Sequence, residues 1–180
     1  MAAGSPAIPL HVESDVRYAI ARISKSNPSL DVIDIRRPAV EELGCLAYSY
    51  GATLLTPHVS EFSALLSHDD VRTREVALEA LAKLDAAVLA QQLSFILPFL
   101  HVENPLLREN ALRCLAVLAL GVLAAHEAAV LCALKDPSGC VRDSAIECLN
   151  KLELCDRERH MPSVLAMLQD TSWRVLQTAQ

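Results

Sequence analysis

The chain has 180 residues, of which 52% are hydrophobic and 4% aromatic, and its formal net charge is −6. The hydrophobic fraction excludes a disordered chain, and the low aromatic fraction requires a core built from Leu, Ala, Val and Ile. The acidic charge, without a run of Lys or Arg, disfavours binding to nucleic acid or to an anionic membrane surface.

Residues 1–10 are expected to form a loose N-terminal tail, and residues 11–180 a single repeat domain. The tail lacks the basic and apolar regions of a secretory signal, and the longest uncharged run, 114–125, is too short to span a bilayer. We therefore expect a soluble, cytoplasmic protein, and nuclear or cytoskeletal association stays open.

A first helix is predicted over residues 15–24, followed by a turn at 27–29. Between residues 32 and 46 the sequence has the apolar pattern of a second helix. The step from Ala39 to Ala77 is longer than the equal steps from Ala77 to Ala111 and on to Ala145, which indicates an insertion of about four residues near Tyr50.

From about residue 60 the sequence repeats every 34 residues, with leucines at 66, 100, 134 and 168 and alanines at 77, 111, 145 and 179. Each repeat passes from a first helix through a polar loop, at 68–70, 103–105 or 136–139, into a second helix. Pro98 is expected to kink or end its helix early. A repeat of this length predicts an all-α solenoid. Its approximate units are 11–50, 51–85, 86–119, 120–153 and 154–180, the last incomplete.

The six cysteines form no C-x-x-C pair. Cys114 and Cys148 are separated by one repeat length, and Ala80 fills the same position one repeat earlier, so we interpret them as buried, reduced thiols. A zinc site formed by Cys140, Cys148 and Cys155 is disfavoured because their spacing matches no common ligand pattern. No metal or other cofactor is expected.

The segment DPSGCVRDSAIECLNKL, which begins at Asp136, resembles a HEAT repeat, whose second helix typically reads D-x-x-x-x-V-R-x-x-A-x-x-x-L. The resemblance covers about residues 30–180 and implies an armadillo-type α-solenoid of four to five HEAT-like hairpins. In HEAT proteins a loop Asp and the Arg that opens the second helix form a ladder between units. Asp136 and Arg142 match this pair, and Arg74 and Arg108 are the other expected ladder arginines. Their loops offer displaced carboxylates, so a partial ladder is expected.

HEAT proteins mostly bind other proteins through the surface lined by their second helices, so a non-catalytic scaffold or adaptor is the function implied. The repeat register predicts an outward acidic row, Glu75, Glu109 and Asp143, that would dock a basic segment of a partner. A merely solvated helical face is the alternative interpretation. Pairs of opposite charge at i, i+4 are expected along these helices. The candidate partner-binding residues are Glu75, Glu79, Glu109, Arg113, Asp143, Glu147, Lys151 and Trp173.

Two other functions remain open. A structural subunit of a large assembly would expose apolar side chains, for which Phe99, Val117 and Trp173 are the candidates. A HEAT-like enzyme, such as a metal-dependent hydroxylase or a relative of the bilin lyases, is less favoured. The one His-Glu pair, at residues 126 and 127, is too little for a di-iron site, and no nucleotide-binding or hydrolase motif appears. The partner's identity, the oligomeric state and the length of the parent protein stay open.

Overall fold

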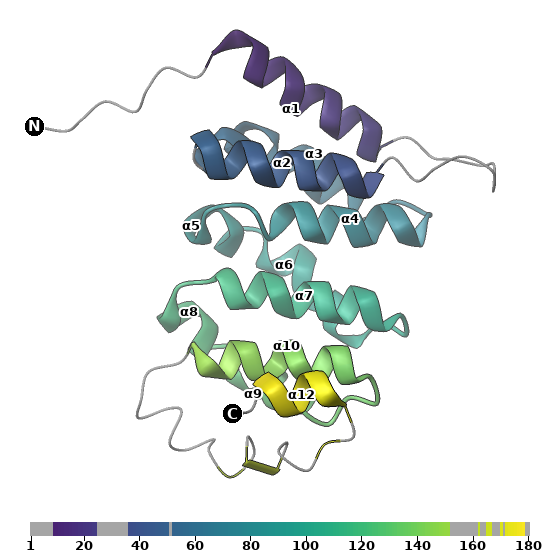
Figure 1. Ribbon diagram of the computed structural model, residues 1–180, viewed down its shortest axis with the longest axis vertical. Helices are drawn as coiled ribbons and strands as arrows, with labels where there is room; N and C mark the ends of the chain where they lie inside the picture. Colours follow the sequence, from purple (N-terminus) through teal and green to yellow (C-terminus); the bar gives the residue numbers. More distant parts are fainter. Residues whose placement is uncertain are drawn as a thin grey trace, which may run out of the picture. The chain divides into compact units, whose positions relative to one another are not determined.

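The computed structural model describes residues 9–24, 36–50, 52–151, 162, 165–166, 170 and 172–178, and these contain helices and turns but no strand (Figure 1). The chain divides into two compact units, Met1–Asp85 and Ala86–Gln180. This division falls between the second and third predicted repeats. In the described part of the chain, no helix is long and apolar enough to cross a membrane.

The first unit contains α1 (Leu10–Ile23), α2 (Arg36–Tyr50), the 3-10 helix η1 (Ala52–His58), α3 (Val59–Leu65) and α4 (Val71–Leu81). Helix α1 packs on α2, and α4 contacts both α2 and α3 (Figure 1). Leu43, Phe62 and Leu78 are fully buried at the centre of this unit. The first helix therefore begins five residues before its predicted start at Asp15.

The second unit contains α5 (Ala86–Ala90), α6 (Leu93–Ile96), η2 (Leu97–His101), α7 (Pro105–Val117), α8 (Leu120–Ala124), α9 (Glu127–Ala133), α10 (Gly139–Asn150) and α12 (Trp173–Thr178). Helix α10 packs against α7, α9 and α12 (Figure 1). The interior is made of Leu, Ala, Val, Ile and Cys side chains, as the composition requires. Ala111 and Ala145 are fully buried, which lets the backbones of α7 and α10 approach closely.

The first arm of each hairpin in this unit is not one continuous helix. One arm is built from α5, α6 and η2, and the next from α8 and α9. Turn hydrogen bonds, from Gln92 N to Leu89 O and from His126 N to Leu123 O, separate the two short helices of each arm. Pro98 lies in the first turn of η2, immediately after α6 ends, which confirms that this proline ends its α-helix early.

The second arms are single helices, and they begin at the polar loops that the sequence predicted. The Asp70 carboxylate accepts a hydrogen bond of 2.9 Å from the Thr73 backbone N–H at the start of α4. The Asn104 side chain accepts bonds of 2.8 and 3.3 Å from the N–H groups of Leu106 and Leu107. These caps satisfy helix donors that would otherwise have no partner.

The predicted burial of the repeated cysteines is confirmed. Cys114 in α7 and Cys148 in α10 are fully buried, and both are thiols. The Cys148 thiol donates a hydrogen bond of 3.3 Å to the Leu112 carbonyl. Burial raises the pKa of each of these two thiols to about 12.

Several predictions lie outside the described residues. These are the tail over residues 1–8, the turn at residues 27–29, Cys155, and most of the predicted last repeat. The side chain of Trp173 is also outside the description, although its backbone belongs to α12.

Candidate functional site

Arg108 near the start of α7 and Arg142 near the start of α10 each form an ion pair with the aspartate 28 residues later in the chain. Arg108 Nε and Nη2 donate to the two carboxylate oxygens of Asp136 at 2.7 and 2.8 Å. Arg142 does the same with Asp170, at 2.7 and 2.6 Å. Each pair is bidentate and little exposed, which is the strongest arrangement available to a guanidinium and a carboxylate.

The remaining donors of these arginines hold the loop of their own repeat. In each case Nη1 donates to the carbonyl oxygens six and five residues earlier. Arg74 makes the same two bonds, to His68 O at 2.6 Å and Asp69 O at 2.9 Å. Each arginine therefore fixes the loop that leads into its own helix.

The carboxylate partners differ from those expected. Arg142 was expected to pair with the Asp136 side chain, but it bonds the Asp136 carbonyl and pairs with the Asp170 side chain. Arg108 bonds the carbonyl of Glu103, its expected carboxylate, and pairs with Asp136 instead. Each arginine side chain is long enough to reach two partners. Its Nη1 binds main-chain carbonyls of the loop before its own helix, and its Nε and Nη2 bind an aspartate 28 residues later in the chain.

These contacts shift the acidity of both partners. Burial of the Asp136 carboxyl acts to raise its pKa, but the hydrogen bond from Arg108, a backbone bond from Ser138 and the charges of Arg108 and Arg142 outweigh it, so the pKa is lowered. The hydrogen bond from Arg142 lowers the pKa of Asp170. The same bonds raise the pKa of both arginines above the usual value. All four groups are therefore charged at neutral pH.

The acidic row was expected to face outward, and this prediction is wrong. Glu75, Glu109 and Asp143 are each 5% exposed. The position lies beside the apolar stripe of its helix, and partner side chains cover it. Arg72 pairs with Glu75 and Arg113 with Glu109, both at 2.8 Å, and the Thr178 hydroxyl donates to Asp143.

Three other predicted residues of the second unit lie at the surface. Arg113, Glu147 and Lys151 are exposed, and we call them the α7–α10 charged face. The Lys151 ammonium donates a hydrogen bond to the Ala116 carbonyl near the end of α7, which ties the two helices together at this face. In the first unit, Glu79 is half-buried on α4. The expected i, i+4 pair between Glu109 and Arg113 is present.

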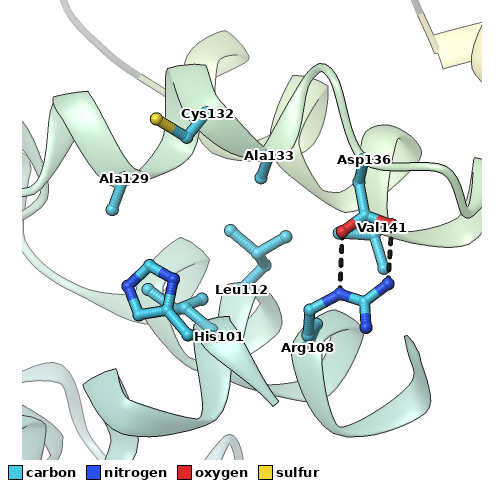
Figure 2. A pocket seen from close by; sticks show the side chains of 9 residues that line it. His101, Arg108, Leu112, Ala129, Cys132, Ala133, Asp136 and Val141 are labelled. Atoms are coloured by element: carbon cyan, nitrogen blue, oxygen red, sulfur yellow. Dashed lines mark hydrogen bonds and ion pairs between the residues drawn. The ribbon is translucent and has the colours of Figure 1, made fainter. Parts of the chain in front are cut away.

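A pocket of about 180 Å³ lies between η2, α7, α9 and α10 (Figure 2). Ala129 and Ala133 point from α9 toward Leu112 of α7, with His101 at one end and the Arg108–Asp136 pair at the other. Sequence reasoning missed this pocket. The sequence does contain a signal for it. Ala129 and Ala133 stand one repeat length after Phe95 and Phe99, so this repeat has two small side chains where the preceding repeat has two large ones.

The His-Glu pair at residues 126 and 127 lies at the start of α9, and His126 is half-buried there. Within the described residues, no group of three or more His, Cys, Asp or Glu side chains could hold a metal ion.

Neither a protein-family model nor a curated protein sequence matches the chain. Solved structures do match it. An engineered protein superposes with a TM-score of 0.66 at 15% identity, over 92% of this chain and 76% of the other. A designed armadillo repeat protein, solved in complex with the peptide (KR)4, superposes with a TM-score of 0.64 at 14% identity, over 90% and 77%.

The fold is an armadillo-type α-solenoid. A third match is YibA of Escherichia coli, with a TM-score of 0.55 at 20% identity. The alignment covers 93% of this chain and 57% of YibA, so the chain spans little more than half of that natural protein. At these identities the likeness establishes the shared fold of stacked helical repeats.

Proposed function

We propose that this solenoid is a non-catalytic scaffold or adaptor, and that partners dock on the surface lined by its second helices. The observation that carries the proposal is the α7–α10 charged face. Arg113 lies on α7, Glu147 on α10, and Lys151 is the residue that follows α10. Close packing and the bidentate pairs at their N-terminal ends fix the positions of these two adjacent helices. Because the helices are already ordered, binding at this face orders side chains but not the main chain.

The partner we propose is a basic peptide segment of another protein. The chain has a net charge of −6, which attracts a cationic segment over several ångströms at low salt. Of the three residues of the α7–α10 charged face, Arg113 is paired with Glu109 and Lys151 is a cation. Glu147 is therefore the carboxylate of this face that can meet a cationic segment. The designed armadillo protein with the same fold was solved with the basic peptide (KR)4, which makes this peptide a suitable probe.

Fluorescence anisotropy of labelled (KR)4, titrated with the protein at low ionic strength, tests the proposal. We expect binding that weakens with added salt, and no binding of a labelled acidic peptide of the same length. The variant Glu147→Lys should bind (KR)4 roughly 2- to 5-fold more weakly, because an exposed charge contributes up to about 1 kcal/mol. Absence of (KR)4 binding would rule out the basic segment.

The matched control is Glu103→Lys, which makes the same change of charge at an exposed site in the loop before α7. Equal weakening in both variants would mean that the total charge, and not the α7–α10 charged face, attracts the peptide. Glu75, Glu109 and Asp143 are unsuitable for this test. They are buried, so reversing their charge would disturb folding as well as binding.

A structural subunit of a larger assembly is a second candidate, and exposed apolar side chains favour it. In the second unit Phe95 is 53% exposed, and Leu106 and Leu120 are also exposed; in the first unit Tyr48 is 94% exposed. Large exposed apolar groups often mark contact surfaces. Light scattering over a range of concentrations distinguishes the candidates, since a chain that self-associates through these groups would lose association on Phe95→Ser.

A further inference from the structure

We infer that the pocket between η2, α7, α9 and α10 receives an aromatic side chain of a protein partner. The inference rests on the proposed function, because the occupant belongs to a bound protein segment. It adds a second, apolar point of attachment, separate from the α7–α10 charged face and formed by other residues.

The pocket exists because two side chains are small. Ala129 and Ala133 take the positions that Phe95 and Phe99 occupy in the preceding repeat. Both alanines are half-buried, so the space beside them opens to solvent and can be reached from outside. In the preceding repeat Phe95 is 53% exposed and Phe99 is half-buried. The smaller side chains of the two alanines leave open the space beside α9.

The size and the lining suit a single aromatic ring. An apolar cavity of about 150 Å³ is large enough to hold benzene, and this pocket has about 180 Å³. Leu112, which is buried, forms its apolar wall opposite the alanines, and the buried Val141 lies at the end beside Asp136 (Figure 2). Water in contact with these groups finds few hydrogen-bond partners, so its displacement by a ring is favourable.

The charges at the pocket favour an aromatic over an aliphatic occupant. The Arg108 guanidinium lines one end and is held by four hydrogen bonds, two to Asp136 and two to loop carbonyls. Asp136 balances the charge of this guanidinium, but a planar guanidinium fixed in this way can stack on the face of a ring without further ordering. At the other end His101 is exposed and can bond a polar group carried by the ring, such as a tyrosine hydroxyl (Figure 2).

Methyl NMR of the full chain, labelled in Ala, Leu and Val, tests the inference with 4-methylphenol, the side-chain analogue of tyrosine. We expect shifts confined to the methyl groups of the Ala, Leu and Val residues that line the pocket, which are Leu100, Leu112, Ala129, Ala133 and Val141. The dissociation constant should be on the order of 1 mM. Cyclohexanol, an aliphatic ring of similar size, should bind several-fold more weakly. Equal affinity for the two rings, or shifts elsewhere only, would overturn the aromatic assignment.

Two variants fill the pocket with residues that the preceding repeat carries, Ala129→Phe and Ala133→Phe. Each should weaken 4-methylphenol binding by at least about tenfold. The control is Ala128→Phe, an exposed position on the same helix, which should leave binding unchanged. Circular dichroism shows whether each variant is folded. If one of the two filling variants does not fold, the other is sufficient for the test. A folded filling variant that still binds the phenol contradicts the inference.

A peptide arm distinguishes a partner's side chain from a free small molecule. A blocked Gly-Gly-Tyr-Gly-Gly peptide should shift the methyl groups of the same residues, and the peptide with Ala in place of Tyr should not. If the free phenol binds and the tyrosine peptide does not, the pocket accepts small molecules only, and the inference is wrong. Binding of (KR)4 is measured separately. Its absence would contradict the proposed docking of a basic segment and leave the pocket inference standing, and absence of phenol binding would contradict the pocket inference alone.

Discussion

Two Arg–Asp pairs dominate the electrostatics of the second unit at the scale of single residues. The pKa values of Asp136 and Asp170 are lowered in the folded protein, mainly by their arginine partners. A carboxyl with a depressed folded-state pKa stabilises the fold fully above its unfolded value, about 3.9, and this contribution is lost as the pH falls through the folded-state pKa. The stability of the second unit should therefore decline below about pH 4.

The variant Asp136→Asn tests this dependence. It removes the charge that Arg108 faces but preserves the shape of the side chain, and we expect the free energy of unfolding to fall by about 1–3 kcal/mol at neutral pH. Its acid-induced decline should be smaller than that of the unchanged protein. Urea unfolding at pH 7 and at pH 3.5 gives both quantities. An undiminished decline in the variant would assign the acid sensitivity to other carboxyls.

The buried thiols give a second prediction at this scale. With a pKa of about 12, Cys114 and Cys148 are almost entirely protonated at pH 8, about one thiolate in 10,000, and they are shielded from reagents. Iodoacetamide should label them at least about a hundredfold more slowly than the exposed Cys45 and Cys132. Mass spectrometry of the digested protein measures each site. Comparable rates at all four thiols would mean that α7 and α10 open readily.

At the scale of helices, side-chain caps stabilise the starts of two second arms, α4 and α7. Asn104 caps α7 through two backbone N–H groups, and Asn104→Ala should lower the free energy of unfolding by about 1 kcal/mol, or the melting temperature by about 3 °C. Asn104→Asp, which retains the accepting oxygen, should remain close to the original. Thermal denaturation followed by circular dichroism compares the three proteins. Equal losses in both variants would implicate the amide group and not the cap.

The second arms were predictable and the first arms less so, for a physical reason. Second arms carry a regular apolar stripe behind a capping residue, and both signals are local. The break between α8 and α9 falls at Ala125 and His126, neither of which is a strong helix breaker. Leu123 of α8 and Val130 of α9 are both buried, and the tertiary packing that buries both short helices is not visible in a local pattern. Pro98 was the exception, since its missing N–H is a local signal.

The predicted binding surface also depended on tertiary contacts that the sequence pattern does not contain. The register correctly aligned Glu75, Glu109 and Asp143, but it could not show that arginine and threonine side chains cover them. Burial of a polar residue depends on neighbours in three dimensions. The arginine–aspartate pairs could have been predicted more easily, because the sequence spacing from Arg108 to Asp136 recurs unchanged from Arg142 to Asp170.

At the scale of the whole molecule, the aspartate that pairs with each repeat arginine is not present in every repeat. At the same spacing after Arg74 the chain has Val102, which carries no carboxylate, whereas both later arginines have an aspartate there. The bidentate pairs described here therefore belong to the second compact unit. In repeat proteins stability is approximately a sum of terms within repeats and between neighbours, so the two units need not respond alike to one substitution.

The variant Arg142→Ala tests that uneven response. It removes the pair with Asp170 and both bonds to the loop before α10. We expect amide hydrogen exchange to accelerate by about tenfold or more in α10 and to change by less than about twofold in α1 and α2, because local opening follows local contacts. Exchange followed by mass spectrometry resolves these helices. Equal acceleration from α1 to α10 would show that the two units unfold as one cooperative body, since only global unfolding exposes every helix to the same extent.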